Sequence, residues 1–342
     1  MSCRIPGVSV VICTYNRCCK LGVALDALLA QDAGVPYEVL VVDNNSTDET
    51  HAVVAERQRQ FPRLHYVFEA RQGLPYARNA GIRAARAAVI AFTDDDVVVG
   101  PEWVGTIASA FEEHPEIDMI GGRVRPVWPR EVPQWVTRIQ LGPFALGERG
   151  DAPIRVSADN AAPCLVGANF AFRREVFERI GLFDPEYTKS QDREIQLRLW
   201  RAGGVGLYLP SLAIRVEVPP ERLTKRYFRY WYTTYGVYHA RMRLLESIDR
   251  EGRLTDARGP RLFGAPGFLY RQLLHHAIRG VAALIRFDRT AAFYRENRVR
   301  YLFSYLRERH RRYAASGQRR SALSEVRCFL TTHRHGGQRP AA

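Results

Sequence analysis

Lysine is scarce in this sequence: of 50 basic residues, only Lys20, Lys189 and Lys225 are lysine. This shortage indicates a coding bias toward arginine rather than selection for one cationic patch. A high count of arginines therefore does not by itself establish a binding surface. Where the arginines lie along the chain is the more informative observation.

The sequence also lacks an uncharged apolar run long enough to cross a membrane. A spanning helix needs ~20 predominantly apolar residues, whereas the nearest candidate, residues 268–287, contains three arginines and two histidines. No signal-peptide pattern precedes the first apolar run, which begins at Val8. We therefore expect neither a spanning helix nor a cleaved leader.

Cysteines in the spacing of a metal site or a disulfide framework are missing as well. The six that occur are Cys3, Cys13, Cys18, Cys19, Cys164 and Cys328. Adjacent Cys18 and Cys19 are poorly placed for a disulfide, and Cys13 lies inside an apolar run, where a thiol behaves as a small core group. These features favour a reducing compartment. We expect a cytoplasmic protein, either free or peripheral on the inner face of the cell membrane.

Charge is divided unevenly along the chain. Residues 1–217 hold 24 basic and 27 acidic side chains, whereas residues 218–342 hold 26 basic and 9 acidic ones. The whole positive excess, a formal net charge of +14, therefore lies in the last third. We expect an anionic membrane surface as the partner of residues 221–315 and no nucleic-acid partner, with simple solvation of the arginines as the alternative.

The first hundred residues alternate short apolar runs with helical patterns. Strands are expected at residues 8–13, 39–42, 64–68 and 88–92, and helices at about 20–30, 46–59 and 74–86. The second helix is expected to open with a capping box from Ser46 to Glu49. This alternation predicts parallel strands with helices on both faces of the sheet. In such sheets, ligands bind outside the carboxyl ends of the strands.

Beyond Pro101 the pattern is less regular. We expect helices near 102–112, 174–180 and 191–201 and strands at 119–121, 167–172 and 205–209. Residues 123–159 are rich in proline and glycine, which predicts a lid or a binding loop. From Arg222 onward the chain is expected to be mostly helical. Its apolar stripes either pack on the main domain or lie on a membrane surface, and both interpretations stay open here.

Polar side chains follow several of the early strands. The clusters are Thr14-Tyr15-Asn16, Asp43-Asn44-Asn45, Arg71-Gln72-Gly73 and Asp94-Asp95-Asp96. Because the carboxyl ends of parallel strands meet at one edge of the sheet, we expect these clusters to converge. Mg²⁺ and Mn²⁺ prefer oxygen ligands and are commonly held by one or two carboxylates together with substrate phosphates. The three aspartates therefore favour a metal–diphosphate site over a solvated acidic turn.

Six motifs, taken in order, resemble those of the family-2 glycosyltransferases, whose fold is called GT-A. They lie at residues 10–17 (VVICTYNR), 41–48 (VVDNNSTD), 77–81 (ARNAG), 92–96 (FTDDD), 167–173 (GANFAFR) and 191–194 (QDRE). The resemblance covers about residues 8–235. It implies an α/β fold with a Rossmann-like open mixed sheet flanked by helices, followed by a C-terminal helical extension.

The resemblance also implies a division of the chain. A GT-A domain is expected at residues 1–220, with a nucleotide-sugar half at about 1–121 and an acceptor half at about 122–220. A basic helical extension at 221–315 and a disordered tail at 316–342 are expected to follow.

The activity implied by the resemblance is that of an inverting glycosyltransferase. It would move a sugar from a nucleotide-diphospho-sugar to a hydroxyl of a carbohydrate or lipid-linked acceptor, in the synthesis of a cell-surface polysaccharide or glycolipid. Mg²⁺ or Mn²⁺ is the expected cofactor, because a divalent cation stabilises the leaving diphosphate. A carboxylate base would remove the proton of the acceptor hydroxyl.

Individual roles follow from the same resemblance. Asp94 and Asp96, the ends of an Asp-any-Asp motif, are expected at the metal, and Asp192 is expected to be the catalytic base. The residues expected to contact the nucleotide or the sugar are Thr14, Tyr15, Asn16, Asp43, Asn45, Arg78, Asn79, Asp94, Asp95 and Asn169. Within this set, Thr14 and Asn16 match contacts to the base and ribose. Asp43 matches the acid that reads the base edge.

The match departs from the family pattern at two places. The family often has Glu directly before its base, where this chain has Gln191. Many members also have a metal-binding His after the next strand, where this chain has Val216 followed by Glu217. Glu217 or water is the expected substitute for that His.

Two other functions remain open from the sequence. A nucleotidyltransferase of similar fold is one, because a fold does not determine the chemistry. Such enzymes usually have a glycine-rich phosphate loop, and residues 13–17 contain no glycine. A catalytically silent nucleotide-sugar-binding protein is the other, and the missing His motivates it.

Overall fold

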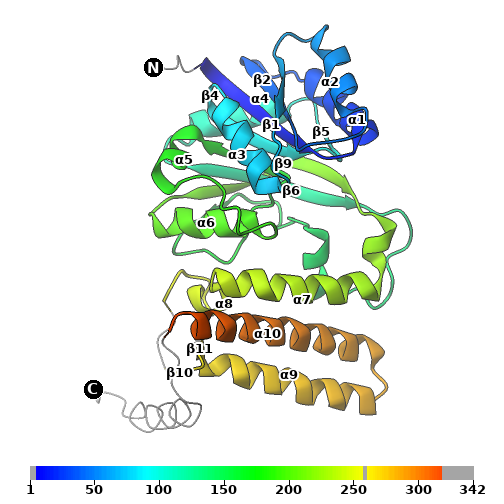
Figure 1. Ribbon diagram of the computed structural model, residues 1–342, viewed down its shortest axis with the longest axis vertical. Coiled ribbons are helices and arrows are strands. Elements are labelled where there is room, and N and C mark those ends of the chain that lie inside the picture. The colour runs from blue at the N-terminus through cyan, green and yellow to red at the C-terminus, as the bar shows by residue number, and fades with distance from the viewer. Residues whose placement is uncertain (1–4, 257–259, 318–342) are drawn as a thin grey trace. The chain divides into compact units, whose positions relative to one another are not determined.

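The computed structural model describes residues 5–256 and 260–317 of the chain. Two compact units make up the chain, the first formed by residues 1–130 and 144–219 and the second by residues 131–143 and 220–342 (Figure 1). The proline- and glycine-rich stretch that the sequence presents as one loop is thus shared between both units. The tail expected to be disordered lies, beyond Gly317, outside the described residues.

A single mixed sheet forms the centre of the first unit. Its strands in the described residues are β1 (Ile5–Thr14), β2 (Tyr37–Asp43), β3 (Leu64–Phe68), β4 (Ala87–Asp94), β5 (Val97–Val99), β6 (Met119–Val127), β7 (Ile154–Val156), β8 (Asn169–Arg173) and β9 (Gly206–Glu217). They are ordered β3-β2-β1-β4-β8-β6-β9-β5, with β7 paired to β9. The first four strands are parallel to one another, whereas β8 is antiparallel to both of its neighbours. The expected open mixed sheet is confirmed.

Helices cover both faces of this sheet. They are α1 (Cys18–Leu29), α2 (Thr50–Gln58), α3 (Leu74–Ala84), α4 (Trp103–Glu113), α5 (Arg174–Ile180) and α6 (Gln191–Arg201). Helices α1, α2 and α4 pack on the face that carries Val10 and Ile12. Helix α3 packs on the opposite face, where a Cβ atom added to Gly81 would come within 2.4 Å of the Val11 side chain. Glycine is therefore needed for α3 to approach β1 so closely.

The expected bounds of several helices and strands agree with the structure, and those of others do not. The ranges expected for β3, α5 and α6 are confirmed. The second helix begins at Thr50, so the expected capping box is wrong: the Ser46 hydroxyl accepts a hydrogen bond from the backbone of Asn16 instead. Strands β6 and β9 are longer than expected because they pair with each other over most of their length.

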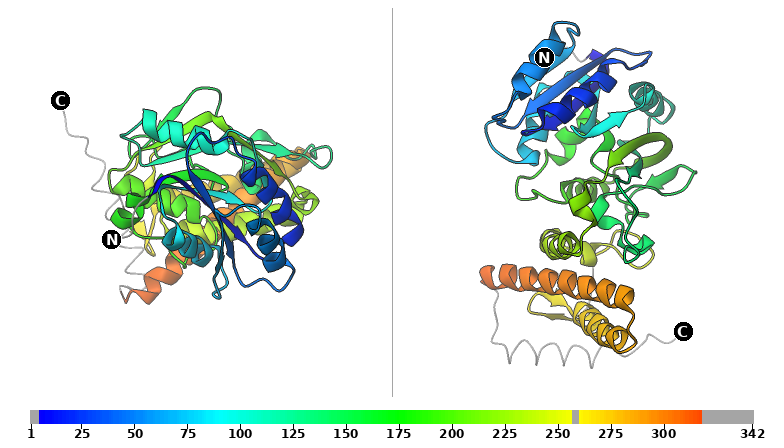
Figure 2. Two further views of the ribbon diagram at one scale, coloured as in Figure 1. Left: turned by 90° about the horizontal axis from the view of Figure 1, so that it is seen from above. Right: turned by 90° about the vertical axis from the view of Figure 1, so that its right-hand side faces the viewer.

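The second unit is helical. Its elements are the 3₁₀ turns η1 (Arg138–Gln140) and η3 (Pro220–Leu223), the helices α7 (Lys225–Arg241), α8 (Leu244–Ser247), α9 (Gly267–Ile285) and α10 (Arg289–Ala315), and the short strands β10 (Arg261–Leu262) and β11 (Ala265–Pro266). A further turn, η2, covers Gly142–Phe144. Helix α10 packs against both α7 and α9 (Figures 1 and 2). Across the described ranges, every helix is too short or too polar to span a membrane.

The core of the second unit is aromatic and contains a buried ion pair. The ring of Trp135 lies edge-on to the rings of Phe228 and Phe293, with centroids 4.9 and 5.0 Å apart. The Glu246 carboxylate is almost fully buried and pairs with Arg309 at 2.8 Å and with Arg261 at 2.7 Å. Without these two arginines, the buried negative charge of Glu246 would destabilise the fold.

Candidate active site

The expected polar clusters meet at the carboxyl ends of β1, β2 and β4. Strand pairing puts Thr14 beside Asp43 and Cys13 beside Asp94. The Thr14 hydroxyl donates a hydrogen bond to Asp95 Oδ2 at 2.8 Å. These contacts bring together residues that are up to 81 positions apart in the sequence, as the alternating pattern predicts.

Arg17 binds two of the three aspartates. Its Nη1 lies 3.0 Å from Asp95 Oδ1 and 3.1 Å from Asp96 Oδ2. The sequence places Arg17 in the first motif but assigned it no role in the site. Its position directly after the polar cluster of β1 was the available signal. The guanidinium thus offsets part of the negative charge of Asp95 and Asp96.

Among the three aspartates, Asp94 has the pKa that is shifted most from its ordinary value. Burial, opposed by the charge of Arg78, raises the pKa of Asp94 to about 6. The carboxylates of Asp96, Asp95 and Asp192 add to this rise. The side chain lies deep among protein atoms but is still 43% exposed through the open mouth of the site. A bound cation would stabilise the charged form of this group.

Arg78 lies below Asp94, in α3. Its guanidinium is stacked near the rings of Phe92, Phe170 and Phe183, at 5.2 to 5.8 Å from their centroids. Its Nη2 donates to the Gly167 carbonyl at 3.1 Å and lies 3.9 Å from Asp94 Oδ1. Its Nη1 is buried without a hydrogen-bond partner among the described atoms. Arg78 thus lies beside the acidic cluster, and its expected contact with the nucleotide-sugar stays a prediction.

Asp43 is buried at the end of β2, and both of its carboxylate oxygens are bonded. Oδ1 accepts from the Ser46 backbone at 2.8 Å, and Oδ2 accepts from the Tyr66 hydroxyl at 2.7 Å. Burial, together with the hydrogen bond to Asp43, raises the pKa of Tyr66. The tyrosine therefore remains a donor at neutral pH, and Asp43 is held in one orientation.

The loop residues Tyr15, Asn16 and Asn45 form the rim beside Asp43. Asn16 and Asn45 have left-handed backbones, with φ of 52° and 67°, a conformation that asparagine adopts more readily than most residues. The Asn16 amide oxygen accepts from the Thr47 backbone at 2.8 Å, which ties the loops after β1 and β2 together. Tyr15 is 47% exposed, so its ring is available to a ligand.

Two residues expected to contact substrate, Asn169 and Asn79, are hydrogen-bonded to neighbouring elements of the protein. Asn169 is fully buried: its Nδ2 donates to the carbonyls of Arg123 and Leu212, and its Oδ1 accepts from Trp103 Nε1 at 2.8 Å. Asn79 is bonded at both ends of its amide to the backbone of Phe183, at 2.7 and 2.9 Å. These bonds fix the position of both amides, and the expected contacts of Asn169 and Asn79 with a ligand stay predictions.

Asp192 lies in the first turn of α6. The residue before the helix, Ser190, has a left-handed φ of 56°, and Asp192 Oδ1 accepts from the Arg193 backbone at 2.9 Å. The charge of Asp192 contributes to the raised pKa of Asp94, so the two carboxylates share one electrostatic environment. The adjoining Gln191 amide oxygen is buried and has no partner among the described residues.

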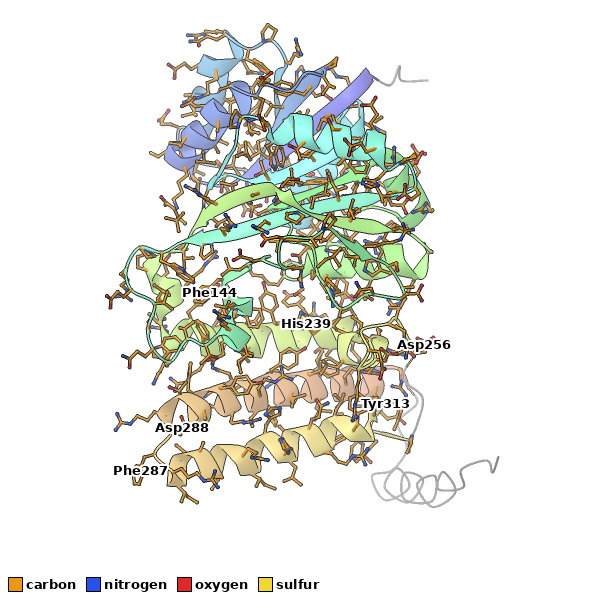
Figure 3. All side chains as sticks on the ribbon, turned by 180° about the vertical axis from the view of Figure 1, so that it is seen from behind. Phe144, His239, Asp256, Phe287, Asp288 and Tyr313 are labelled. Carbon is orange, nitrogen blue, oxygen red and sulfur yellow. The ribbon has the colours of Figure 1, made fainter. Side chains whose placement is uncertain are left out.

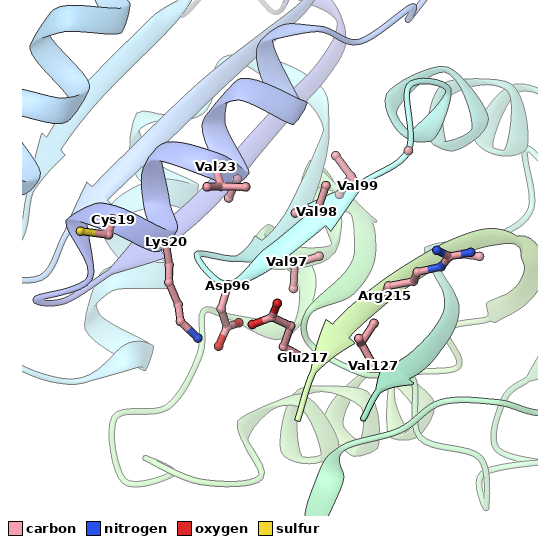
Figure 4. Close-up of a pocket in the computed structure, with 13 residues that line it drawn as sticks. Cys19, Lys20, Val23, Asp96, Val97, Val98, Val99, Val127, Arg215 and Glu217 are labelled. Carbon is pink, nitrogen blue, oxygen red and sulfur yellow. The ribbon is translucent and has the colours of Figure 1, made fainter. Parts of the chain in front are cut away.

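A cavity of about 660 Å³ adjoins Asp96 in the first unit. The valines of β5 and Val23 line it, with Lys20, Asp96 and Glu217 at one end (Figure 4). Val97 pairs with Val216 across the antiparallel β5 and β9, so Glu217 comes opposite Asp96. Figure 4 shows the two carboxylates pointing toward each other.

The carboxylates fit a divalent cation that is completed by its substrate. In the part of the chain that the structure describes, no three His, Cys, Asp or Glu side chains converge as a complete metal site. Asp94, Asp96 and Glu217 nevertheless offer oxygen atoms, the donors that Mg²⁺ and Mn²⁺ prefer. Such ions are usually held by one or two carboxylates plus substrate phosphates. The donor set therefore suits a cation that arrives with a diphosphate.

Comparison of the sequence with known families gives one match. The family model described as glycosyl transferase family 2 matches residues 9–181, about half of the chain. A glucosyl-dolichyl phosphate glucuronosyltransferase of Haloferax volcanii is 26% identical over 191 residues, which are 55% of this chain and 59% of that protein. A validoxylamine A glucosyltransferase of Streptomyces hygroscopicus subsp. jinggangensis is 30% identical over 244 residues, 64% of this chain and 57% of that protein. The chain thus spans somewhat more than half of each relative.

Solved structures share the fold. A mannosyltransferase from Pyrobaculum calidifontis, in complex with GDP-Man and Mn²⁺, superposes with a TM-score of 0.58 at 20% identity and covers 89% of this chain and 87% of its own. Staphylococcus aureus TarS 1–349, in complex with UDP, superposes with a TM-score of 0.52 at 19% identity, over 88% of this chain and 91% of its own. At this level of identity the likeness shows the fold alone.

Proposed function

Because this chain belongs to glycosyl transferase family 2, we propose that it transfers a sugar from a nucleotide-diphospho-sugar to an acceptor hydroxyl and inverts the anomeric carbon. The observation that supports this most is that Asp94, Asp95 and Asp96, at the carboxyl end of β4, share an electrostatic environment with Asp192 of α6. Four carboxylates gathered in an open site favour a cationic ligand on one side and proton removal on the other. The relatives named above are transferases of glucuronosyl and glucosyl groups, which supports the reaction class.

The donor is held, in this proposal, by the β1, β2 and β4 ends. Asp43 reads the edge of the nucleobase, Tyr15 and Asn45 lie at the rim, and Arg78 balances charge near the diphosphate. Asp94 and Asp96, with Glu217 in place of the family His, bind Mg²⁺ or Mn²⁺, which stabilises the negative charge of the leaving diphosphate. The bonds of Asp95 to Thr14 and Arg17 keep the cluster in place.

Asp192 serves as the base. Its carboxylate takes the proton of the acceptor hydroxyl as the new glycosidic bond forms and the bond to the diphosphate breaks. If the hydroxyl attacks from the side opposite the diphosphate, a single displacement inverts the anomeric centre.

The larger setting is proposed from the chain as a whole. We assign residues 1–220 to the catalytic domain, with a nucleotide-sugar half at 1–121 and an acceptor half at 122–220, and residues 221–315 to a helical extension. The acceptor is a carbohydrate or lipid-linked sugar in polysaccharide or glycolipid synthesis, on the cytoplasmic side of a membrane. The basic extension rests on that membrane, since its positive charge suits an anionic surface.

The test is release of nucleoside diphosphate from UDP-, GDP- and dTDP-sugars in the presence and absence of Mn²⁺. Metal-dependent turnover of one donor supports the proposal. Lack of turnover with every donor, together with lack of metal-dependent nucleotide binding, overturns it. Metal-dependent binding without turnover, even with a range of acceptors, favours a silent binding protein, which the ion pairs of Arg17 with Asp95 and Asp96 motivate.

A further inference from the structure

The outer face of α9 is apolar and exposed to solvent. Its large apolar side chains and that of the following turn are 57–87% exposed: Leu274, Ile278, Val281, Leu284, Ile285 and Phe287. Because the helical members recur three or four positions apart, they lie on one side of the helix; together with Phe287 we call them the α9 face. Figure 3 shows Phe287 at the turn between α9 and α10. An exposed apolar face on a folded protein marks a site of association.

A cationic groove adjoins the α9 face within the second unit. It is a cavity of about 490 Å³ between α7, α9 and α10. Its cations are Lys225, Arg229, Arg289 and Arg295, and they surround apolar side chains. Val281 and Leu284 belong both to this lining and to the α9 face, so the two surfaces are continuous.

Two cations of the groove have no carboxylate partner in the ranges that the structure describes. The Lys225 ammonium lies 5.2 Å from the centroid of the Phe293 ring, and Arg289, the first residue of α10, makes no ion pair. Glu296 is the acid that lines the groove, and Arg229 already bonds it at 2.8 Å. The groove therefore has a positive charge that the described chain does not compensate.

The same positive charges affect the pKa of His276. Burial, together with the charges of Arg298, Arg295 and His275, lowers the pKa of His276 to about 4. The imidazole lines the groove and stays neutral at physiological pH. Burial is the larger cause of this shift, and the arginines that add to it also attract an anion.

An apolar face that continues into a cationic groove suits an anionic phospholipid, which has acyl chains and a phosphate. A nucleic acid would leave the apolar face in water. A second copy of the chain, meeting this one through the same face, would bring two surfaces of like charge together.

We propose that the α9 face and the cationic groove form a docking surface for a bilayer of anionic phospholipid. Lys225 and Arg289 bond the lipid phosphates, while Leu284, Ile285 and Phe287 insert among the acyl chains. The assignment rests on the proposed function, whose membrane partner it narrows to one helix and one groove. Docking itself needs no sugar transfer, so it can be measured separately.

Flotation of the full-length protein with vesicles tests the docking surface. Vesicles of phosphatidylcholine alone are compared with vesicles that also contain phosphatidylglycerol, at low and high salt. We expect at least about tenfold stronger binding to the anionic vesicles, because each basic side chain near the surface adds to the attraction. High salt should reduce this difference, since it screens the charges.

Paired variants locate the surface. The double substitution Leu284→Ser/Ile285→Ser removes apolar contact, and Arg289→Glu reverses one charge; each should weaken binding to anionic vesicles about tenfold. The matched controls are Ile139→Ser, which is also an exposed isoleucine, and Arg59→Glu, an exposed arginine at the end of α2. Both controls should bind as the parent does. Thermal unfolding of each variant verifies that it is folded.

Four outcomes overturn the proposal: no vesicle binding, equal binding to both kinds of vesicle, unchanged binding by folded α9-face variants, and a dimer that Leu284→Ser/Ile285→Ser dissociates. The last would make a second copy the occupant. Nucleoside diphosphate release is measured on the same samples without vesicles. Turnover without vesicle binding refutes only the docking surface, whereas vesicle binding with neither turnover nor metal-dependent nucleotide binding refutes only the proposed function.

Discussion

The charged side chains of the two units are arranged in opposite ways. In the first unit, Asp94, Asp95 and Asp96 lie together in an open site. Burial raises the pKa of Asp94, and the charges of Asp96 and Asp95 raise it further. In the second unit, the buried acids Glu246 and Glu308 are each bound by arginines, while Arg289 has no acid as a partner in the ranges that the structure describes. Charge of one sign that is only partly compensated lowers stability and favours a ligand of opposite charge. The ligand proposed for the first unit is therefore a cation, and the ligand proposed for the second unit is an anion.

Asp192→Asn tests the acidic half of this comparison most severely. We expect transfer to fall by about 10²- to 10⁴-fold, because the amide removes no proton from the acceptor. Donor affinity should stay near that of the parent, since the base does not hold the diphosphate. Initial rates of diphosphate release and calorimetric titration with the donor measure the two quantities. Asp159→Asn, an exposed aspartate outside the site, is the control, and near-normal transfer by Asp192→Asn would mean that the base is another residue.

Glu246→Gln tests the buried ion pairs of the second unit. The substitution leaves Arg309 and Arg261 without a counter-charge in a buried position, at a cost of about 3 kcal/mol in the free energy of unfolding. Glu296→Gln is the matched control, because its pairs with Arg229 and Arg300 are partly exposed and are worth less than about 1 kcal/mol. Urea denaturation followed by fluorescence compares them. Similar losses for both variants would contradict the importance of the buried acid.

Asp96→Ala separates cation binding from fold. We expect Mn²⁺-dependent nucleotide binding to weaken at least about 100-fold, since even residues behind a metal ligand change metal affinity by up to that factor. Stability without metal should change by less than about 1 kcal/mol, because the lost ion pair with Arg17 is partly exposed and the carboxylate lies among other negative charges. Titration with the nucleotide at several Mn²⁺ concentrations measures the effect, with Asp32→Ala as the control for an exposed aspartate. Unchanged Mn²⁺ dependence would remove Asp96 from the metal site.

Local patterns predicted much of the first unit. The early strands and helices could be located because the spacing of apolar residues marks each element and polar residues follow the strands. The end of α6 could be predicted because Gly203 and Gly204 stop the helix. The convergence of Thr14 with Asp95 followed from parallel pairing alone. These features depend on residues that are close in sequence or on a general rule of sheet topology.

Asn169 shows why the remainder could not be predicted. A polar amide after Gly167 and Ala168 looks like a ligand contact in the sequence. In the structure, the register of β6 and β9 shifts between Gly122 and Arg123, and Asn169 Nδ2 bonds the carbonyls of Arg123 and Leu212 near that shift. Its role depends on a defect in the pairing of two distant strands, which no local pattern reveals. The ion pairs of Arg17 depend in the same way on residues 78 and 79 positions away.

The smallest predicted effect concerns the charge of Asp94. Because its pKa is about 6 in the folded protein and its ordinary value is 3.8, the folded state holds the proton more tightly than the unfolded state does. Stability of the ligand-free protein should therefore decline as the pH rises from about 4 to about 6 and stay lower above that window. Asp94→Asn cannot lose a proton, so it should raise the melting temperature by a few degrees at pH 7.5 and by almost nothing at pH 4.

Thermal unfolding with and without Mn²⁺ plus a nucleoside diphosphate distinguishes the cause. In the parent protein, the cation and diphosphate should stabilise the site more at pH 7.5 than at pH 5, because protonated Asp94 is a poor ligand. Asp94→Asn should lose most of this dependence on pH. An equal gain in melting temperature at both pH values would show that the mutation improves packing instead. Asp94 would then be an ordinary acid, and the contrast between an acidic unit awaiting a cation and a basic unit awaiting an anion would rest on Asp96 and Asp192 alone.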